Sequence, residues 1–151
     1  MIVGQKKFLP GLASLILFAL SCTGFARDAE PVVQGKWFME LRVREVPGLV
    51  LKQRDITIFV GAREADGTYR VLTHFTTDAV SEIEGAVGRP ECAGKKECTY
   101  DGGSEGIGTL RGNKFYVDWL DEGWIDDVFT ITGDRMYGDD GNGPLDFTRL
   151  D

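Results

Sequence analysis

Histidine is nearly absent from this sequence, and no familiar catalytic motif is present. The chain of 151 residues contains one histidine, His74, whereas a catalytic histidine needs a partner side chain within hydrogen-bond reach. His74 has the opposite parity to Val71 and Phe75 in an alternating segment, which indicates a position on a strand. No G-x-S-x-G or comparable nucleophile motif occurs. We therefore assign no catalytic residue, and the sequence does not favour an enzyme.

Two acidic stretches have the residue types of functional sites. Asp121-Glu122 and Asp126-Asp127 flank Trp124, and paired carboxylates around an aromatic ring suit sugar chemistry. The stretch DDGNG (139–143) resembles a calcium loop, but it lacks the alternating ligands and terminal glutamate of an EF-hand. Exposed turns of an acidic protein explain both stretches, and we favour that interpretation.

Cysteine is also scarce. Cys22 lies in the leader discussed below, so Cys92 and Cys98 are the pair left for the folded domain. An even cysteine count in an exported chain indicates a disulfide. A zinc site would need further cysteine or histidine ligands. We expect a Cys92–Cys98 disulfide, no metal and no cofactor.

The N-terminus is typical of a secretory signal peptide. Residues 1–26 are basic, then apolar, then small before Arg27. The apolar run is about 15 residues long, shorter than the roughly 20 that a membrane span needs. Cys22 offers a minor alternative as a lipidated residue, although Ala19 stands where such signals favour leucine. We expect a cleaved signal peptide and a periplasmic or secreted protein without a membrane span.

Basic residues are outnumbered by acidic ones. Removing 26 of the 151 residues leaves 125, enough for a single domain over 27–151. Because Lys6 and Lys7 are lost with the leader and no acid is, 15 basic and 24 acidic side chains remain, a net charge of −9. Nucleic acid and anionic lipid would repel such a chain, so neither is an expected partner.

Long amphipathic helices are missing, and segments of alternating polarity take their place. In QGKWFMELRV (34–43), Trp37, Met39, Leu41 and Val43 share one parity, which indicates a strand with one buried face. Asp66-Gly67 is a strong hairpin signal. Further alternating segments occupy 54–62, 68–77, 108–120, 124–132 and 145–150. The less regular stretch DGGSEGIG (101–108) is interpreted as a loop.

These short strands and tight turns predict an all-β fold. Strands joined by hairpins form an up-and-down antiparallel sheet, and closure into a barrel removes the sheet's edges. We predict a single antiparallel up-and-down β-barrel of about eight strands. A two-sheet β-sandwich is the alternative.

The two ends of the domain resemble a known group of barrels. Gly35-Lys36-Trp37 is a G-x-W at the start of the first strand, and Arg149 lies in the last strand, LDFTRL. This pairing is similar to that of the calycins, the group that includes lipocalins and avidins. The resemblance implies that Trp37 closes one barrel end with Arg149 across its ring, a cation–π contact. Trp37 and Arg149 are therefore expected to be structural residues.

A small barrel rich in aromatic residues can keep an internal pocket. We expect an exported, non-catalytic binding protein for a small apolar or amphipathic molecule, entering at the end opposite Trp37. The alternative is an inhibitor or interaction protein that binds an exported macromolecule through the loop Glu91–Asp101. The side chains expected to line the ligand site are Met39, Leu41, Val43, Val71, Phe75, Phe115, Val117 and Trp119.

Overall fold

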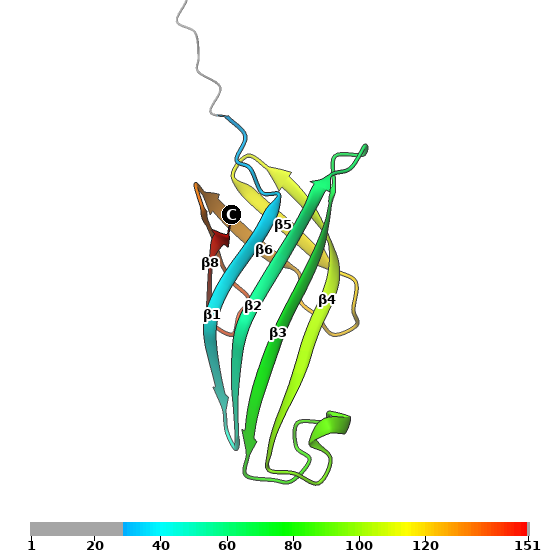
Figure 1. The fold of residues 1–151 in the computed structure, drawn as a ribbon, viewed down its shortest axis with the longest axis vertical. Coiled ribbons are helices and arrows are strands. Elements are labelled where there is room, and N and C mark those ends of the chain that lie inside the picture. The colour runs from blue at the N-terminus through cyan, green and yellow to red at the C-terminus, as the bar shows by residue number, and fades with distance from the viewer. Residues whose placement is uncertain (1–28, 151) are drawn as a thin grey trace, which may run out of the picture.

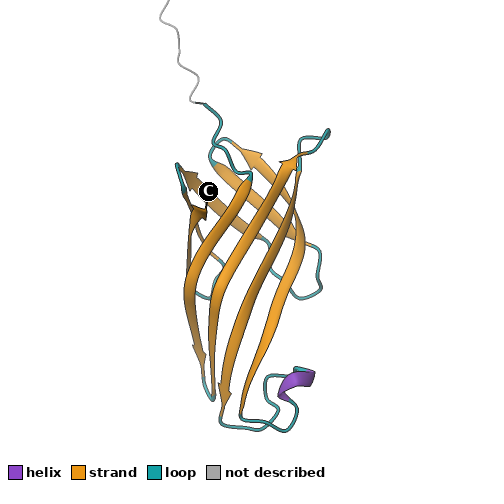
Figure 2. Cartoon of the chain, viewed as in Figure 1, coloured by secondary structure: helices purple, strands orange, loops and turns teal. Residues whose placement is uncertain are grey.

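The computed structural model describes residues 29–150, which form a closed antiparallel barrel of eight strands in up-and-down order (Figures 1 and 2). The expected signal peptide and the cleavage site before Arg27 lie outside the described residues. The strands are β1 (Gly35–Val46), β2 (Leu49–Arg63), β3 (Tyr69–Ser81), β4 (Glu97–Arg111), β5 (Lys114–Trp119), β6 (Asp127–Thr132), β7 (Arg135–Asp139) and β8 (Pro144–Leu150), with a 3-10 turn η1 (Pro90–Cys92) between β3 and β4. The all-β fold and the up-and-down barrel topology are confirmed, and the sandwich alternative is wrong.

The strands are of unequal length, and this shapes the molecule. β1 to β4 have 12 to 15 residues each, whereas β5 to β8 have 5 to 7. β8 pairs with β1 only over Lys36–Phe38, and β5 pairs with β4 only over Gly106–Arg111. The barrel is therefore closed near one end, and the first four strands continue beyond it as an open sheet (Figure 1).

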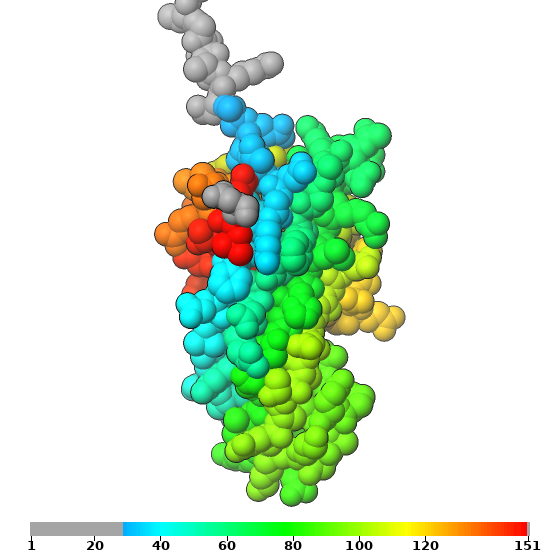
Figure 3. Space-filling view, in the orientation of Figure 1, coloured from blue at the N-terminus to red at the C-terminus, as the bar shows by residue number. Residues whose placement is uncertain are grey.

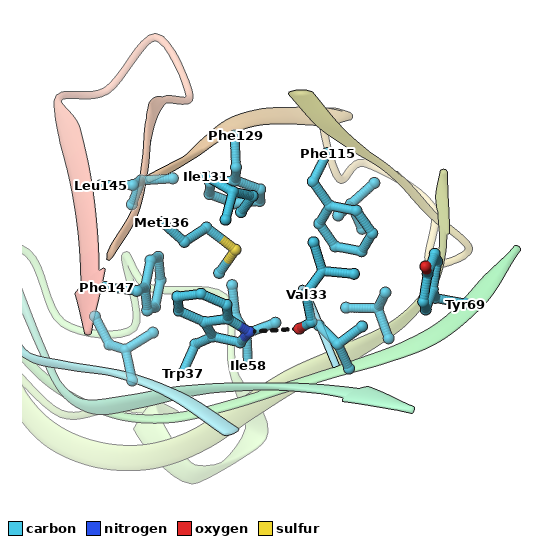
Figure 4. Packing of buried hydrophobic residues seen from close by; sticks show 14 of the residues in the cluster. Val33, Trp37, Ile58, Tyr69, Phe115, Phe129, Ile131, Met136, Leu145 and Phe147 are labelled. Carbon is cyan, nitrogen blue, oxygen red and sulfur yellow. Dashed lines mark hydrogen bonds between the residues drawn. The ribbon is translucent and has the colours of Figure 1, made fainter. Parts of the chain in front are cut away.

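The closed end has the arrangement expected from the first-strand tryptophan. Trp37 is 0% exposed, and its Nε1 donates a hydrogen bond to the carbonyl oxygen of Val33 at 2.8 Å (Figure 4). Trp37 and Arg149 are cross-strand partners, and the Arg149 guanidinium lies 4.7 Å from the centre of the indole ring. Met136 and Phe147 lie beside the same indole (Figure 4). The residues that fill this end come from both ends of the chain and close the barrel between β1 and β8.

The far end of the molecule is formed by the segment between β3 and β4 (Figure 3). The predicted disulfide is present, joining Cys92 of η1 to Cys98 of β4. Cys92 is 0% exposed, and the Arg89 guanidinium lies 5.0 Å from the ring centre of Tyr100 on β4. The disulfide and this contact hold the loop against the end of β4.

The stretch interpreted as a loop, 101–108, is instead part of β4. Its glycines allow close contact with aromatic rings from the adjacent strands. A Cβ atom on Gly102 would lie 2.4 Å from the Phe75 ring, and one on Gly108 would lie 2.3 Å from the Phe115 ring. The apolar pattern that reveals a strand is missing here because neighbouring aromatic side chains fill the space in front of the glycines.

The expected inward face of β1 is correct for Trp37 and Met39 and wrong for Leu41 and Val43. Leu41 and Val43 are 54% and 45% exposed. The faces of β1 change between Met39 and Leu41, beside Asp55 of β2, which has a φ of 53°, although the pairing of β1 with β2 keeps one register. Beyond this point the even-numbered side chains of β1 point inward.

The same irregularity is a β-bulge against β3. Arg54 pairs with Thr76 and Thr57 pairs with His74, so Asp55 and Ile56 together face a single residue of β3. A bulge reverses the faces of a strand. As a result, odd-numbered residues of β2 before the bulge and even-numbered ones after it share the interior.

Candidate functional site

A pocket of about 390 Å³ opens at the end of the closed barrel opposite Trp37, where the short strands stop. Its volume is at the small end of the roughly 300–1,000 Å³ typical of small-molecule sites. Its floor is apolar and continuous with the core, formed by Ile56, Ile58, Phe129, Leu145 and Phe147. A ligand in this pocket would therefore place apolar atoms against the barrel interior.

One wall of the pocket is aromatic. Phe75 comes from β3, Trp119 from the end of β5, and Trp124 from the loop between β5 and β6. The ring centres of Trp119 and Trp124 are 5.4 Å apart, and those of Phe75 and Trp124 are 6.1 Å apart. Trp119 is buried, whereas Trp124 is partly exposed. The wall therefore combines a fixed indole with a second indole carried by a loop.

The opposite rim carries an ion pair. The Arg42 guanidinium of β1 donates two hydrogen bonds to the Asp140 carboxylate, at 2.8 and 2.5 Å. Burial raises the pKa of Asp140, but hydrogen bonds from Arg42 and from the Asn142 backbone N–H outweigh it, so the pKa lies below its ordinary value. Asp140 follows β7, so this bidentate pair joins β1 to the β7–β8 turn beyond their last strand contact.

Asp127 is the second carboxylate that lines the pocket. One of its oxygens accepts a hydrogen bond from the Trp119 indole Nε1 at 2.8 Å. Within residues 29–150, no arginine, lysine or histidine lies within salt-bridge distance of it. Burial, opposed by the Trp119 hydrogen bond, raises the pKa of Asp127. The pocket therefore contains a partly desolvated carboxylate without a cationic partner.

The residues expected to line a ligand site fall into three groups. Phe75 and Trp119 line the pocket. Met39 is partly buried against the core, and Leu41 and Val43 are on the outer face. The remaining three are buried in the core and do not line the pocket: Val71, Phe115 and Val117. Whether any of these residues binds a ligand stays a prediction.

Several pocket residues were not expected from the sequence. Arg42 and Arg44 belong to the polar parity of their segment, and only the shift at Asp55 brings them to the pocket. Asp127 and Asp140 lie in the acidic stretches that were interpreted as exposed turns. The available signal was the clustering of Asp126-Asp127 beside Trp124, and strand parity did not reveal that the Asp127 side chain meets Trp119.

The described residues outside the pocket were also compared with the requirements of a catalytic histidine, a metal site and a membrane span. His74 is exposed on the outer face of β3. Among residues 29–150, no three His, Cys, Asp or Glu side chains gather as metal ligands. In the same range, no helix has the length and apolar character needed to cross a membrane.

Compared with family models, with curated proteins and with solved structures, the chain gives no match. The fold and the site therefore define this protein only by its architecture. It is a closed eight-stranded up-and-down barrel with one sealed end and one end open to a pocket.

Proposed function

We propose that this protein is an exported, non-catalytic binding protein of the calycin type that takes a small apolar or amphipathic ligand into the pocket. The observation that carries the proposal is the difference between the two barrel ends. One end is sealed by Trp37 and Arg149, and the other holds a pocket with an apolar floor. This is the arrangement by which small barrels hold one ligand.

Binding can be tested by titrating the native protein with an apolar fluorescent dye and following indole fluorescence. Trp119 and Trp124 line the pocket, so a saturable change in their emission is the expected result. Trp124→Ala should weaken binding, since it removes one aromatic wall. Leu41→Asp should leave binding unchanged, because Leu41 is outside the barrel. The absence of any saturable response across dyes, fatty acids and retinoids would remove ligand binding as the function.

Export can be tested on protein recovered from the host envelope or medium. Cleavage before Arg27 and an oxidised Cys92–Cys98 pair together define one intact mass under non-reducing conditions. A retained leader would contradict the export proposal, and a mass increase on Cys22 would favour the lipidated form.

A second candidate function is inhibition of an exported macromolecule through the loop Glu91–Asp101. The observation that favours it is the disulfide, which fixes this loop at the far end of the two long strands β3 and β4 (Figure 1). An acidic protein suits a basic partner such as a lysozyme. Inhibition of lysozyme that is lost in Cys92→Ser/Cys98→Ser protein, with the pocket empty of any ligand, would favour this function.

A further inference from the structure

The polar groups of the pocket differ in what they leave unsatisfied, and this difference indicates which charge a ligand should carry. An ionised carboxylate can accept about four hydrogen bonds. Asp127 accepts one, from Trp119, and has no cationic partner among residues 29–150. Asp140, by contrast, has Arg42 as a bidentate partner. Of the charged residues that line the pocket, Asp127 and Arg44 have no ion pair among residues 29–150, and of these two only Asp127 is partly buried.

The surroundings of Asp127 suit a cation for a second, independent reason. The indoles of Trp119 and Trp124 lie together at the pocket wall, and Phe75 extends that wall. The faces of aromatic rings attract cations, and indole does so most strongly. Asp127 contacts the Nε1–H edge of Trp119, and the ring centre of Trp124 lies 5.4 Å from that of Trp119, so a cation beside Asp127 would lie near this aromatic wall as well as the carboxylate.

The same pocket is less favourable for an anionic ligand than for a cationic one. Arg42 is held by Asp140, so an anionic group would have to displace that carboxylate. Arg44 also lines the pocket, but it is exposed, and solvent screens its charge. The full chain carries a net charge of −7, which raises the local concentration of cations and lowers that of anions.

We propose that the ligand class is an organic cation, an ammonium group attached to an apolar body. The ammonium lies against Asp127 and the indoles of Trp119 and Trp124, and the apolar body rests on the floor of the pocket. This inference rests on the proposed function, because it names the ligand class of the same site. Burial of Asp127, which raises the pKa of its carboxyl, is consistent with a group that gains a partner on binding.

The test compares three probes of equal chain length on the native protein by calorimetry. Octylammonium, octanol and octanoate share an eight-carbon chain and differ in head-group charge, and the ammonium group also carries N–H donors from which the Asp127 carboxylate can accept hydrogen bonds. We expect the cation to bind about tenfold tighter than octanol or more, as hydrogen-bonded and charged contacts usually contribute. Octanoate should bind weakest.

Three variants test which residues produce the preference for the cation. Asp127→Asn keeps an oxygen for the Trp119 hydrogen bond and removes the charge, so it should reduce the preference for the cation over octanol and leave only the part that the aromatic wall contributes. Asp118→Asn is the matched control, because Asp118 is exposed on the outer face of β5 and is not a pocket residue. Trp124→Ala provides a second variant, which should lower cation affinity in protein whose Asp127 is intact.

The outcomes separate the two proposals. If octanol binds as tightly as the cation, or octanoate binds more tightly, the ligand class is wrong while ligand binding stands. A cation preference that survives Asp127→Asn undiminished overturns the role given to Asp127 in holding the ammonium. If none of the three probes binds, and the dye titration also fails, both proposals fall.

Discussion

Trp37 is the residue that links the two ends of the chain. Its indole is buried, hydrogen-bonded to Val33 and covered by Arg149, while the guanidinium Nε and one terminal nitrogen of Arg149 are buried without a hydrogen-bond partner. A buried guanidinium that gives up hydrogen bonds for an indole face indicates that this contact matters for closure of the barrel.

Trp37→Ala should lower the free energy of unfolding by about 3–5 kcal/mol, the usual loss for a buried aromatic side chain. Arg149→Ala should cost less, about 0.5–2 kcal/mol, because it removes a cation–π contact and leaves the core in place. Urea denaturation measures both. Arg70→Ala, at an exposed position of β3, is the control, and an unchanged midpoint for Trp37→Ala would contradict the role given to the closed end.

Asp127 should give the stability of the protein a distinct pH dependence. Burial raises the pKa of Asp127, with Asp140 and Asp126 adding to the effect and Arg42 and the Trp119 hydrogen bond opposing it. The folded state therefore binds more protons than the unfolded chain between the ordinary pKa and the raised one. The stability contribution of this residue rises as pH falls through the raised pKa and is complete below the ordinary value.

Asp127→Asn removes this dependence. The free energy of unfolding of the variant minus that of the native chain should be largest near neutral pH, where the native carboxylate is charged. It should decrease as pH falls through the raised pKa. Taking the difference cancels the opposite trend of groups such as Asp78 and Asp140, whose pKa values are lowered. A difference that stays constant with pH would show that Asp127 ionises as it does in the unfolded chain.

At the scale of the element, β4 depends on its glycines. Gly106 and Gly108 face the barrel interior, where the rings of Trp119 and Phe115 occupy the space that a side chain would need. The strand is thus built from residues that are usually depleted in strands, and large side chains from its neighbours compensate for them.

Gly108→Ala should destabilise the protein by about 1–3 kcal/mol, the usual cost of overpacking a core. The added Cβ would lie 2.3 Å from the Phe115 ring and 3.1 Å from Val71. Gly61→Ala is the matched control on β2, since a Cβ there would meet its nearest atom at 3.5 Å, an ordinary contact. Thermal unfolding distinguishes the two, and equal midpoints would mean that Phe115 moves away at little cost.

The same elements show how far sequence patterns extend. Alternation and turn residues such as Asp66-Gly67 were enough to predict most strands, because a strand with one buried face repeats every two residues. Alternation could not reveal the bulge at Asp55. The φ of Asp55 is positive, but an aspartate in a strand sequence does not signal this as a glycine would. That single irregularity moved Leu41 out and Arg42 in, so the polar rim of the pocket was not predictable from parity.

At the scale of the whole molecule, the closed barrel and its sealed end followed from the strand count and from Trp37 and Arg149. The unequal strand lengths could not be predicted from the sequence, because the glycine-rich half of β4 has no apolar pattern. These lengths position the pocket: β5 to β8 end early, and the aromatic wall and the Arg42–Asp140 pair occupy the opening that they leave.

The overhang of the first four strands leaves two strand edges without partners in the described part of the chain: β1 beyond Phe38 and β4 before Gly106. Unpaired backbone groups along an edge can template pairing with another copy of the chain. Glu40, Arg44 and Glu45 occupy one edge, and burying their charges in a continuous intermolecular sheet would be costly. Glu40→Val/Glu45→Val protein should therefore self-associate. In sedimentation-velocity experiments its sedimentation coefficient should rise with protein concentration more steeply than that of the native chain.

Glu84→Val/Glu122→Val is the control, because it removes the same charge from loops outside any strand. Equal behaviour of the two double variants would attribute the effect to net charge alone. If only the edge variant associates, then the charges along the overhang do more than keep the protein soluble. They allow a sheet to stay open beside a pocket without becoming the start of a fibre.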